Sequence, residues 1–355
     1  MKSGRNLRDL AVELRRQLNA KQDLLAPSRL IQCDTGPGGT CELALDVAGD
    51  RRAYIVSDIA MHQLAEKLKI PFGYFERMRR ERPELLDENV NTWLQASGNE
   101  NRLVRTLDGR VRAFLSDRYR RLDNYDVAEF VLPILERLPG AVPASTELTE
   151  SRMYIKYICR RLQCEVAPGD MVCAGVVVSN SEVGWGHLTV EPLLYRLVCS
   201  NGLIAKDLVL RKKHLGKTMQ LQEAAVELYK EDTLQADDRA ILLKVRDMVE
   251  AAVSDVTFRL IVDKLRRTAG IKLADDPVKS VEVLAHRFAL SEDERSGVLR
   301  SLIEGSQLSG YGLVNAVTSY SQDVLDYDRA TELETVGGRL VSLSDSEWRE
   351  IADPA

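Results

Sequence analysis

The fold is decided by the stretch RLVRTLDGRVRAFLSDRYRRLDN, which runs over Arg102–Asn124. Within residues 110–115 every second residue is apolar, and this period of two is typical of a strand with one buried face. The dipeptide Asp108-Gly109 precedes that run and favours a tight two-residue turn. We therefore predict that residues 103–107 and 110–115 pair as the two antiparallel strands of a hairpin.

The same stretch holds seven arginines and no lysine, together with Phe114 and Tyr119. Guanidinium groups grip phosphate oxygens and stack on bases, and aromatic rings stack on bases too. Arginines interleaved with aromatic residues are thus typical of a surface that follows a nucleic-acid strand. The alternative is a charged, solvated hairpin, in which some arginines pair with Asp117, Asp123 or Asp126 and hold the turn.

A meander and a helix pair precede the hairpin. The runs RLIQCD, CELALDV and RRAYIVS are strand-like and lie between glycine-rich turns, so they predict a small antiparallel meander within residues 29–57. Two helices follow, separated by a break at Ile70-Pro71. An alternative for this pair is a DNA-reading helix-turn-helix, whose second helix carries Arg77, Arg79, Arg80 and Arg82.

A second strand-rich part extends from about residue 150 to residue 210. The runs MYIKYICRRLQCEV and MVCAGVVVSN flank a Pro-Gly-Asp turn, and another turn is expected at Asn201-Gly202. One basic cluster with tyrosines lies at 152–161 in the first of these strands, and another lies at 211–217 beyond the last. Three basic clusters in one half of the chain exceed what solubility requires, and they favour an anionic partner.

From Gln220 onward the apolar period becomes helical. One or two long helices are expected to end at Ala269-Gly270, and shorter ones to occupy 277–288, 292–304 and 311–325. The fold class is therefore α+β, with a mixed, mainly antiparallel sheet core and flanking helices, followed by an α-helical C-terminal region. We divide the chain into an N-terminal helix (1–25), a basic α+β core (26–219, with a possible sub-boundary near 100 or 145) and an acidic helical domain (220–355).

Charge and apolar content limit the class of protein. The formal net charge is −5, but residues 1–219 are net positive whereas 220–355 are strongly negative. No apolar run approaches the length of a membrane span, and the N-terminal segment has no signal-peptide core. The six cysteines lack CxxC spacing. We expect a soluble cytoplasmic protein with reduced thiols, no membrane contact and no cofactor.

No motif for catalysis emerges from the residues. The chain has only four histidines, and the HLGKT segment at 214–218 lacks the first glycine of a phosphate-binding loop. Carboxylates that hold a divalent cation in a nuclease are an alternative, with Asp117, Asp123, Asp126 and Glu191 as candidates. Helix capping and pairing with arginine explain them more simply, so we predict neither a catalytic residue nor a metal ligand.

Four segments resemble successive parts of a known family. They are IPFGYFERMRRERPELLDENVNTWL (70–94), DGRVRAFLSDRYRRLDNYDV (108–127), YRLVCSNGL (195–203) and YGLVNAVTSYSQDV (311–324). They are similar to the phage- and plasmid-encoded family called domain of unknown function 932, over about residues 50–330. The resemblance implies a protein of mobile genetic elements that acts in replication, recombination or defence. It assigns no catalytic residue.

The leading hypothesis is a DNA-binding protein of phage or plasmid DNA metabolism that grips single-stranded DNA and anneals it as a homo-oligomer. The predicted nucleic-acid contacts are Arg110, Arg112, Arg118, Arg120, Arg121, Arg152, Lys156, Arg160, Arg211, Lys212 and Lys213. The predicted base-stacking residues are Phe114, Tyr119, Tyr154 and Tyr157. Two alternatives stay open. One is the metal-dependent nuclease, and the other is an anti-defence factor whose acidic C-terminal helices bind a basic host protein.

Overall fold

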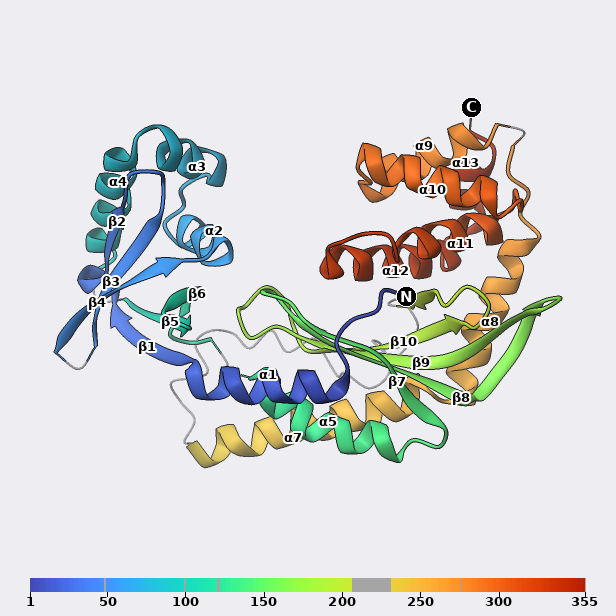
Figure 1. The fold of residues 1–355 in the computed structure, drawn as a ribbon, viewed down its shortest axis with the longest axis horizontal. Coiled ribbons are helices and arrows are strands. Elements are labelled where there is room, and N and C mark those ends of the chain that lie inside the picture. The colour runs from blue at the N-terminus through green and yellow to red at the C-terminus, as the bar shows by residue number, and fades with distance from the viewer. Residues whose placement is uncertain (48, 99, 120–121, 206–230, 275, 355) are drawn as a thin grey trace.

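The computed structural model describes the whole chain except residues 48, 99, 120–121, 206–230, 275 and 355, which Figure 1 draws in grey. Its described part contains two β-sheets and flanking helices, followed by a helical C-terminal region (Figure 1). The α+β class is therefore confirmed. The predicted boundary near residue 220 lies outside the described residues.

The first sheet has six strands in the order β1-β5-β6-β4-β3-β2. Its strands are β1 (Gln22–Pro27), β2 (Gln32–Thr35), β3 (Cys41–Val47), β4 (Asp50–Val56), β5 (Asn101–Leu107) and β6 (Arg110–Ser116). The predicted meander is β2-β3-β4, and the predicted hairpin is β5-β6. At the hairpin turn, Asp108 and Gly109 both have positive φ, as a tight two-residue turn requires. Only β4 and β6 run parallel, over two residue pairs.

Helices α2 (Asp58–Lys67), α3 (Phe72–Glu81) and α4 (Pro83–Ala96) accompany this sheet, whereas α1 (Leu7–Ala20) packs against the second sheet. A short 3-10 helix, η1 (Ser28–Leu30), joins β1 to β2. The break at Pro71 is confirmed, but the segment FGYFERMRRERPELL is not one helix. Pro83 starts a new helix there, since a proline without N–H is tolerated in the first turn and disrupts a helix interior.

The second sheet is antiparallel, in the order β11-β10-β9-β8-β7. Its strands are β7 (Ala141–Leu148), β8 (Met153–Ala167), β9 (Asp170–Asn180), β10 (Thr189–Arg196) and β11 (Gly202–Ile204). On one face lie α1, α5 (Asn124–Arg137) and α7 (Glu231–Ala252), whose apolar residues share a core with β8, β9 and β10 (Figure 1). The other face is covered as well, so this sheet is buried on both sides.

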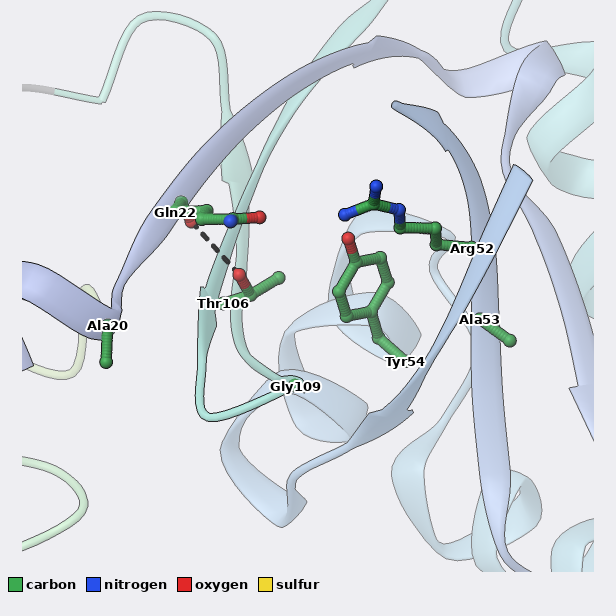
Figure 2. A pocket seen from close by; sticks show the side chains of 7 residues that line it. All are labelled: Ala20, Gln22, Arg52, Ala53, Tyr54, Thr106 and Gly109. Atoms are coloured by element: carbon green, nitrogen blue, oxygen red, sulfur yellow. Dashed lines mark hydrogen bonds between the residues drawn. The ribbon is translucent and has the colours of Figure 1, made fainter. Parts of the chain in front are cut away.

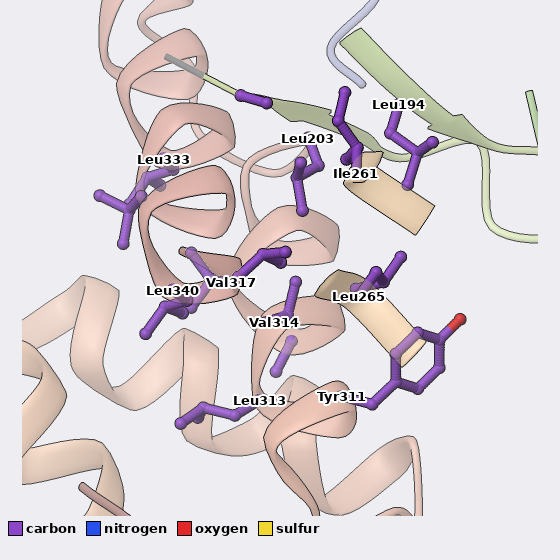
Figure 3. Close-up of a cluster of buried hydrophobic side chains, with 14 of the residues drawn as sticks. Leu194, Leu203, Ile261, Leu265, Tyr311, Leu313, Val314, Val317, Leu333 and Leu340 are labelled. Carbon is purple, nitrogen blue, oxygen red and sulfur yellow. The ribbon is translucent and has the colours of Figure 1, made fainter. Parts of the chain in front are cut away.

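The C-terminal helices cover that other face. They are α8 (Asp255–Ala269), α9 (Pro277–Phe288), α10 (Glu292–Glu304), α11 (Gly310–Tyr320), α12 (Tyr327–Val341) and α13 (Asp345–Ala352). Figure 3 shows side chains of α8, α11 and α12 packing against Leu194 and Leu203 of the sheet. The bounds predicted for α9 and α10 are confirmed. Among the described residues, no helix combines the length and the apolar character needed to cross a bilayer.

Candidate nucleic-acid interface

The arginine-rich block at 102–124 divides into a buried and an exposed part. Arg105 on β5 has a fully buried side chain. Its guanidinium donates to Asp23 at 2.7 Å, to Asp123 at 2.6 Å and to the Glu182 carbonyl at 2.7 Å. Arg112 on β6 lies 2.8 Å from the Glu182 carboxylate. These arginines join the hairpin of the first sheet to the β9–β10 loop of the second.

This arrangement corrects the nucleic-acid role predicted for Arg112. Its side chain is largely buried, and its ion pair with Glu182 lies between the two sheets rather than in solvent. Asp123 immediately precedes α5, but its side chain makes no capping hydrogen bond. It binds Arg105 and Lys21 instead. Of the acids in the charged-hairpin alternative, Asp123 does pair with a hairpin arginine, but that arginine is Arg105 rather than Arg118, and Arg112 pairs with the distant Glu182.

Asp123 makes the junction sensitive to acid. Burial alone would raise its pKa, but the positive charges of Arg105 and Lys21 outweigh that effect and lower the pKa to about 2. An unfolded aspartate titrates near 3.9. The ionised carboxylate therefore adds stability above about pH 4, and this stability is lost as the pH falls toward 2.

Asp123→Asn should reduce the loss of stability in acid. Between about pH 5 and about pH 3, the free energy of unfolding of the wild type should fall by roughly 1 kcal/mol more than that of the variant, because only the wild type must protonate this carboxylate. Urea titrations across that range measure the difference. Parallel pH profiles for the two proteins would contradict the ion pairing seen here.

The second basic cluster also turns inward. Lys156 on β8 is fully buried, and its Nζ lies 2.7 Å from the Glu334 Oε2 and 3.0 Å from the Thr331 hydroxyl, both on α12. The same ammonium lies 4.7 Å from the ring centre of Tyr327. The prediction that Lys156 contacts nucleic acid is therefore wrong for this fold, since α12 covers that face of the sheet.

Burial also overturns three of the four stacking predictions. Phe114, Tyr154 and Tyr157 are between 0% and 5% exposed. Phe114 joins the core of the first sheet, and Tyr157 joins the core beneath the second. The fourth, Tyr119, is partly buried and donates its hydroxyl to the Ser181 carbonyl. Its ring is thus part of the junction between the sheets.

The remaining basic candidates are exposed, partly exposed or not described. Arg110, Arg118 and Arg160 are exposed, and Arg152 is partly exposed. Since a strand rises about 3.3 Å per residue, Arg160 lies roughly 26 Å along β8 from Arg152, so the two belong to different surfaces. Five predicted contacts lie outside the described residues: Arg120, Arg121, Arg211, Lys212 and Lys213.

An aromatic residue that the sequence reasoning passed over lies beside Arg152. Trp185, in the β9–β10 loop, is 46% exposed. Its ring meets the His62 ring edge-on, with centroids 5.8 Å apart, and His62 stacks on Phe72. Arg152 donates to the Trp185 carbonyl at 3.0 Å. An exposed indole, a stacked ring pair and a guanidinium thus converge on one surface, which we call the Trp185 platform.

The loop that carries Trp185 is held by side chains from α2, from β5 and from the segment that follows β6. Gln63 of α2 donates to the Val183 carbonyl at 2.7 Å, and Arg105 and Tyr119 donate to the two preceding carbonyls. The Trp185 amide in turn donates to the Ser181 hydroxyl at 3.1 Å. Because its backbone is bound at successive residues, the loop presents the indole in a defined position and loses little entropy when a ligand binds.

The sequence did contain a signal for this loop, the motif Gly184-Trp185-Gly186. A Cβ on Gly186 would lie 1.8 Å from an Arg152 guanidinium nitrogen, and one on Gly184 would lie 2.7 Å from Leu115. Gly184 also has a φ of +73°, in the region that favours glycine. The two glycines thus let the hairpin and Arg152 approach the loop closely and leave the tryptophan in solvent.

The carboxylates of the nuclease alternative do not form a cation site among the described residues, in which no group of three metal-ligating side chains occurs. The Asp123 carboxylate pairs with the side chains of Lys21 and Arg105, and Asp117 is exposed. Burial, followed by the charge of Asp123, raises the pKa of Asp126. The described carboxylates therefore do not gather into a metal site, whereas the Trp185 platform brings aromatic and basic side chains together on one surface.

Comparisons with known proteins add one finding. Residues 112–340, well over half of the chain, match the family described as Domain of unknown function (DUF932). The match begins at residue 112, inside β6, whereas the resemblance noted in the sequence began near residue 50. The segment at 70–94 therefore lies outside the match. Neither the curated proteins nor the solved structures include a match. Because the matched residues extend from within β6 to within α12 and cover well over half of the chain, this chain belongs to the family of domain of unknown function 932.

Proposed function

We propose that the protein binds single-stranded DNA on the Trp185 platform. The observation that carries the proposal is the exposed Trp185 indole, fixed on an anchored loop beside Arg152. An exposed tryptophan in contact with other rings gives bases a stacking surface, and stacking of this kind is tolerant of sequence. A guanidinium at its edge supplies a partner for the phosphate of the same nucleotide.

Two arginines of the original prediction fit this surface. Arg152 uses one terminal nitrogen on the Trp185 carbonyl, and its other nitrogens have no partner among the described residues. Arg118 is exposed and adjoins Tyr119, whose hydroxyl binds the same loop at Ser181. Bases would stack on the indole and the His62–Phe72 pair, while these two guanidiniums contact phosphates of the same strand.

We also propose that the bound strand is presented for pairing with a second strand. A strand whose bases stack in a row while its backbone is held by arginines is ready to pair with a second strand. Binding of this kind suits recombination or replication of phage or plasmid DNA, including annealing by an oligomer. Each of these roles requires that the protein first bind a single strand.

Fluorescence anisotropy with a labelled single strand, measured across a salt series, tests the binding. Wild-type protein should bind at micromolar concentration or below in low salt, with a log–log slope of about −0.7 for each phosphate neutralised. Arg118→Ala and Arg152→Ala should each weaken binding and reduce the slope by about 0.7.

Arg300→Ala serves as the matched control, since it removes an exposed arginine from α10 in the C-terminal region. Its affinity and its slope should equal those of the wild type. Micromolar protein that leaves the strand free at low salt would refute the proposal, and so would equal effects of the three substitutions.

A further inference from the structure

A hollow of about 460 Å³ opens in the first sheet (Figure 2), and none of the residues that line it belongs to the Trp185 platform. It exists because β4 and β6 pair only at Ile55–Arg110 and Val56–Val111. Upstream of Ile55, β4 has no partner on this side, so it diverges from the end of the β5–β6 hairpin. The space between them is lined by Ala20, Gln22, Arg52, Ala53, Tyr54, Thr106 and Gly109.

A buried hydroxyl lies at the wall of this hollow. Tyr54 is only 6% exposed, and among the described residues its hydroxyl makes no hydrogen bond of normal geometry, although the Arg52 guanidinium lies beside it. Figure 2 shows the phenol hydroxyl directed toward the Arg52 guanidinium, with Gln22 and Thr106 across the space on the opposite strands. Buried polar atoms are almost always hydrogen-bonded, so one without a hydrogen bond of normal geometry at the wall of a cavity indicates a ligand atom that completes it.

A guanidinium lies at the same wall. Arg52 and Tyr54 are two residues apart on β4 and therefore project from the same face, with the guanidinium beside the phenol (Figure 2). The Arg52 Nε contacts Asp50 at 3.2 Å, and the guanidinium also lies against the Tyr54 hydroxyl. Two side chains thus direct several N–H and O–H donors into one space from different angles.

We propose that this hollow binds a small phosphomonoester of mononucleotide size. The tetrahedral oxygens of a phosphate accept from donors that are not coplanar, which matches a guanidinium fork combined with a phenol. The remaining wall offers the Gln22 side-chain amide for a sugar or base, while the Thr106 hydroxyl donates to the Gln22 carbonyl at 3.3 Å and can only accept from a ligand. The volume falls within the roughly 300–1,000 Å³ usual for small-molecule sites. The site shares no residue with the proposed DNA-binding surface, so each stands or falls alone.

Isothermal titration calorimetry with three probes tests this site on the full chain. Adenosine 5′-monophosphate should bind saturably, inorganic phosphate more weakly, and adenosine least of all, because only the phosphate meets the donors. Arg52→Gln should weaken binding of the monophosphate at least about tenfold, and Tyr54→Phe about fivefold. The phenylalanine variant removes one oxygen and keeps the packing, so its thermal midpoint reports whether the fold is intact.

Arg51→Gln is the matched control. Arg51 is the neighbouring arginine on β4, exposed and hydrogen-bonded to Gln32, and strand alternation directs it to the opposite face. Its affinity for the monophosphate should be that of the wild type. The proposal is overturned if adenosine binds as well as its monophosphate, if no probe binds at millimolar concentration, or if Arg51→Gln weakens binding as much as Arg52→Gln.

Discussion

Trp185→Ala is expected to weaken binding of single-stranded DNA by roughly tenfold to a hundredfold. Stacking of a base on an aromatic side chain contributes about 1–3 kcal/mol per base, and Trp185 is the exposed ring of its platform. The loop is held through backbone atoms and through the Ser181 hydroxyl, so removing the indole leaves those hydrogen bonds in place. Anisotropy titrations at fixed salt measure the change.

Trp93→Ala provides the control for the loss of an exposed tryptophan. Trp93 lies on α4 and is 51% exposed, close to the value for Trp185. This substitution should leave the affinity for DNA unchanged, and Trp185→Phe should keep most of it because a ring remains. If Trp185→Ala binds the strand as tightly as the wild type does, the platform is not the binding surface.

Lys156→Met is expected to destabilise the protein by about 3–5 kcal/mol, the usual cost of leaving one buried charge without its partner. Lys156 and Glu334 both have fully buried side chains, and the second Glu334 oxygen already lacks a hydrogen-bond partner. Without the Lys156 ammonium, the carboxylate stays buried between β8 and α12 and loses its ion-pair partner. Urea denaturation of the variant and the wild type gives the difference.

The double substitution Lys156→Met with Glu334→Leu separates charge from packing. Replacing both ions by apolar residues of similar volume should restore most of the lost stability, since buried ion pairs contribute little more than an apolar pair does. A single variant that loses less than about 1 kcal/mol, or a double variant no more stable than the single one, would contradict this account.

Local elements of the fold were predictable because their signals lie close together in the chain. Asp108-Gly109 predicted the hairpin since only residues that tolerate positive φ suit its turn. Ser291 and Glu294 form a capping box, and Pro277 starts the preceding helix, so α9 and α10 have the bounds that the pattern indicated. Each of these signals acts within a few residues.

The candidate site was less predictable because it depends on which faces are covered. The pattern of 152–161 shows basic and aromatic residues alternating, but it cannot show that α12 lies over Lys156 or that helices cover Tyr157. The sequence pattern did not indicate Trp185, because the rings beside it come from a distant part of the chain. Its neighbours His62 and Phe72 are more than 100 residues away in the chain, so no local spacing connects them.

The sequence by itself determined the α+β class, the hairpin, the helical C-terminal part and an unusual concentration of arginine in residues 102–124. Only the tertiary structure decided which arginines join the two sheets and which remain open to a ligand. Arg105 and Arg118 have the same chemistry, yet one is enclosed by Asp23, Asp123 and the β9–β10 loop while the other is exposed. The physical reason is that burial and ion pairing arise from segments brought together only by folding.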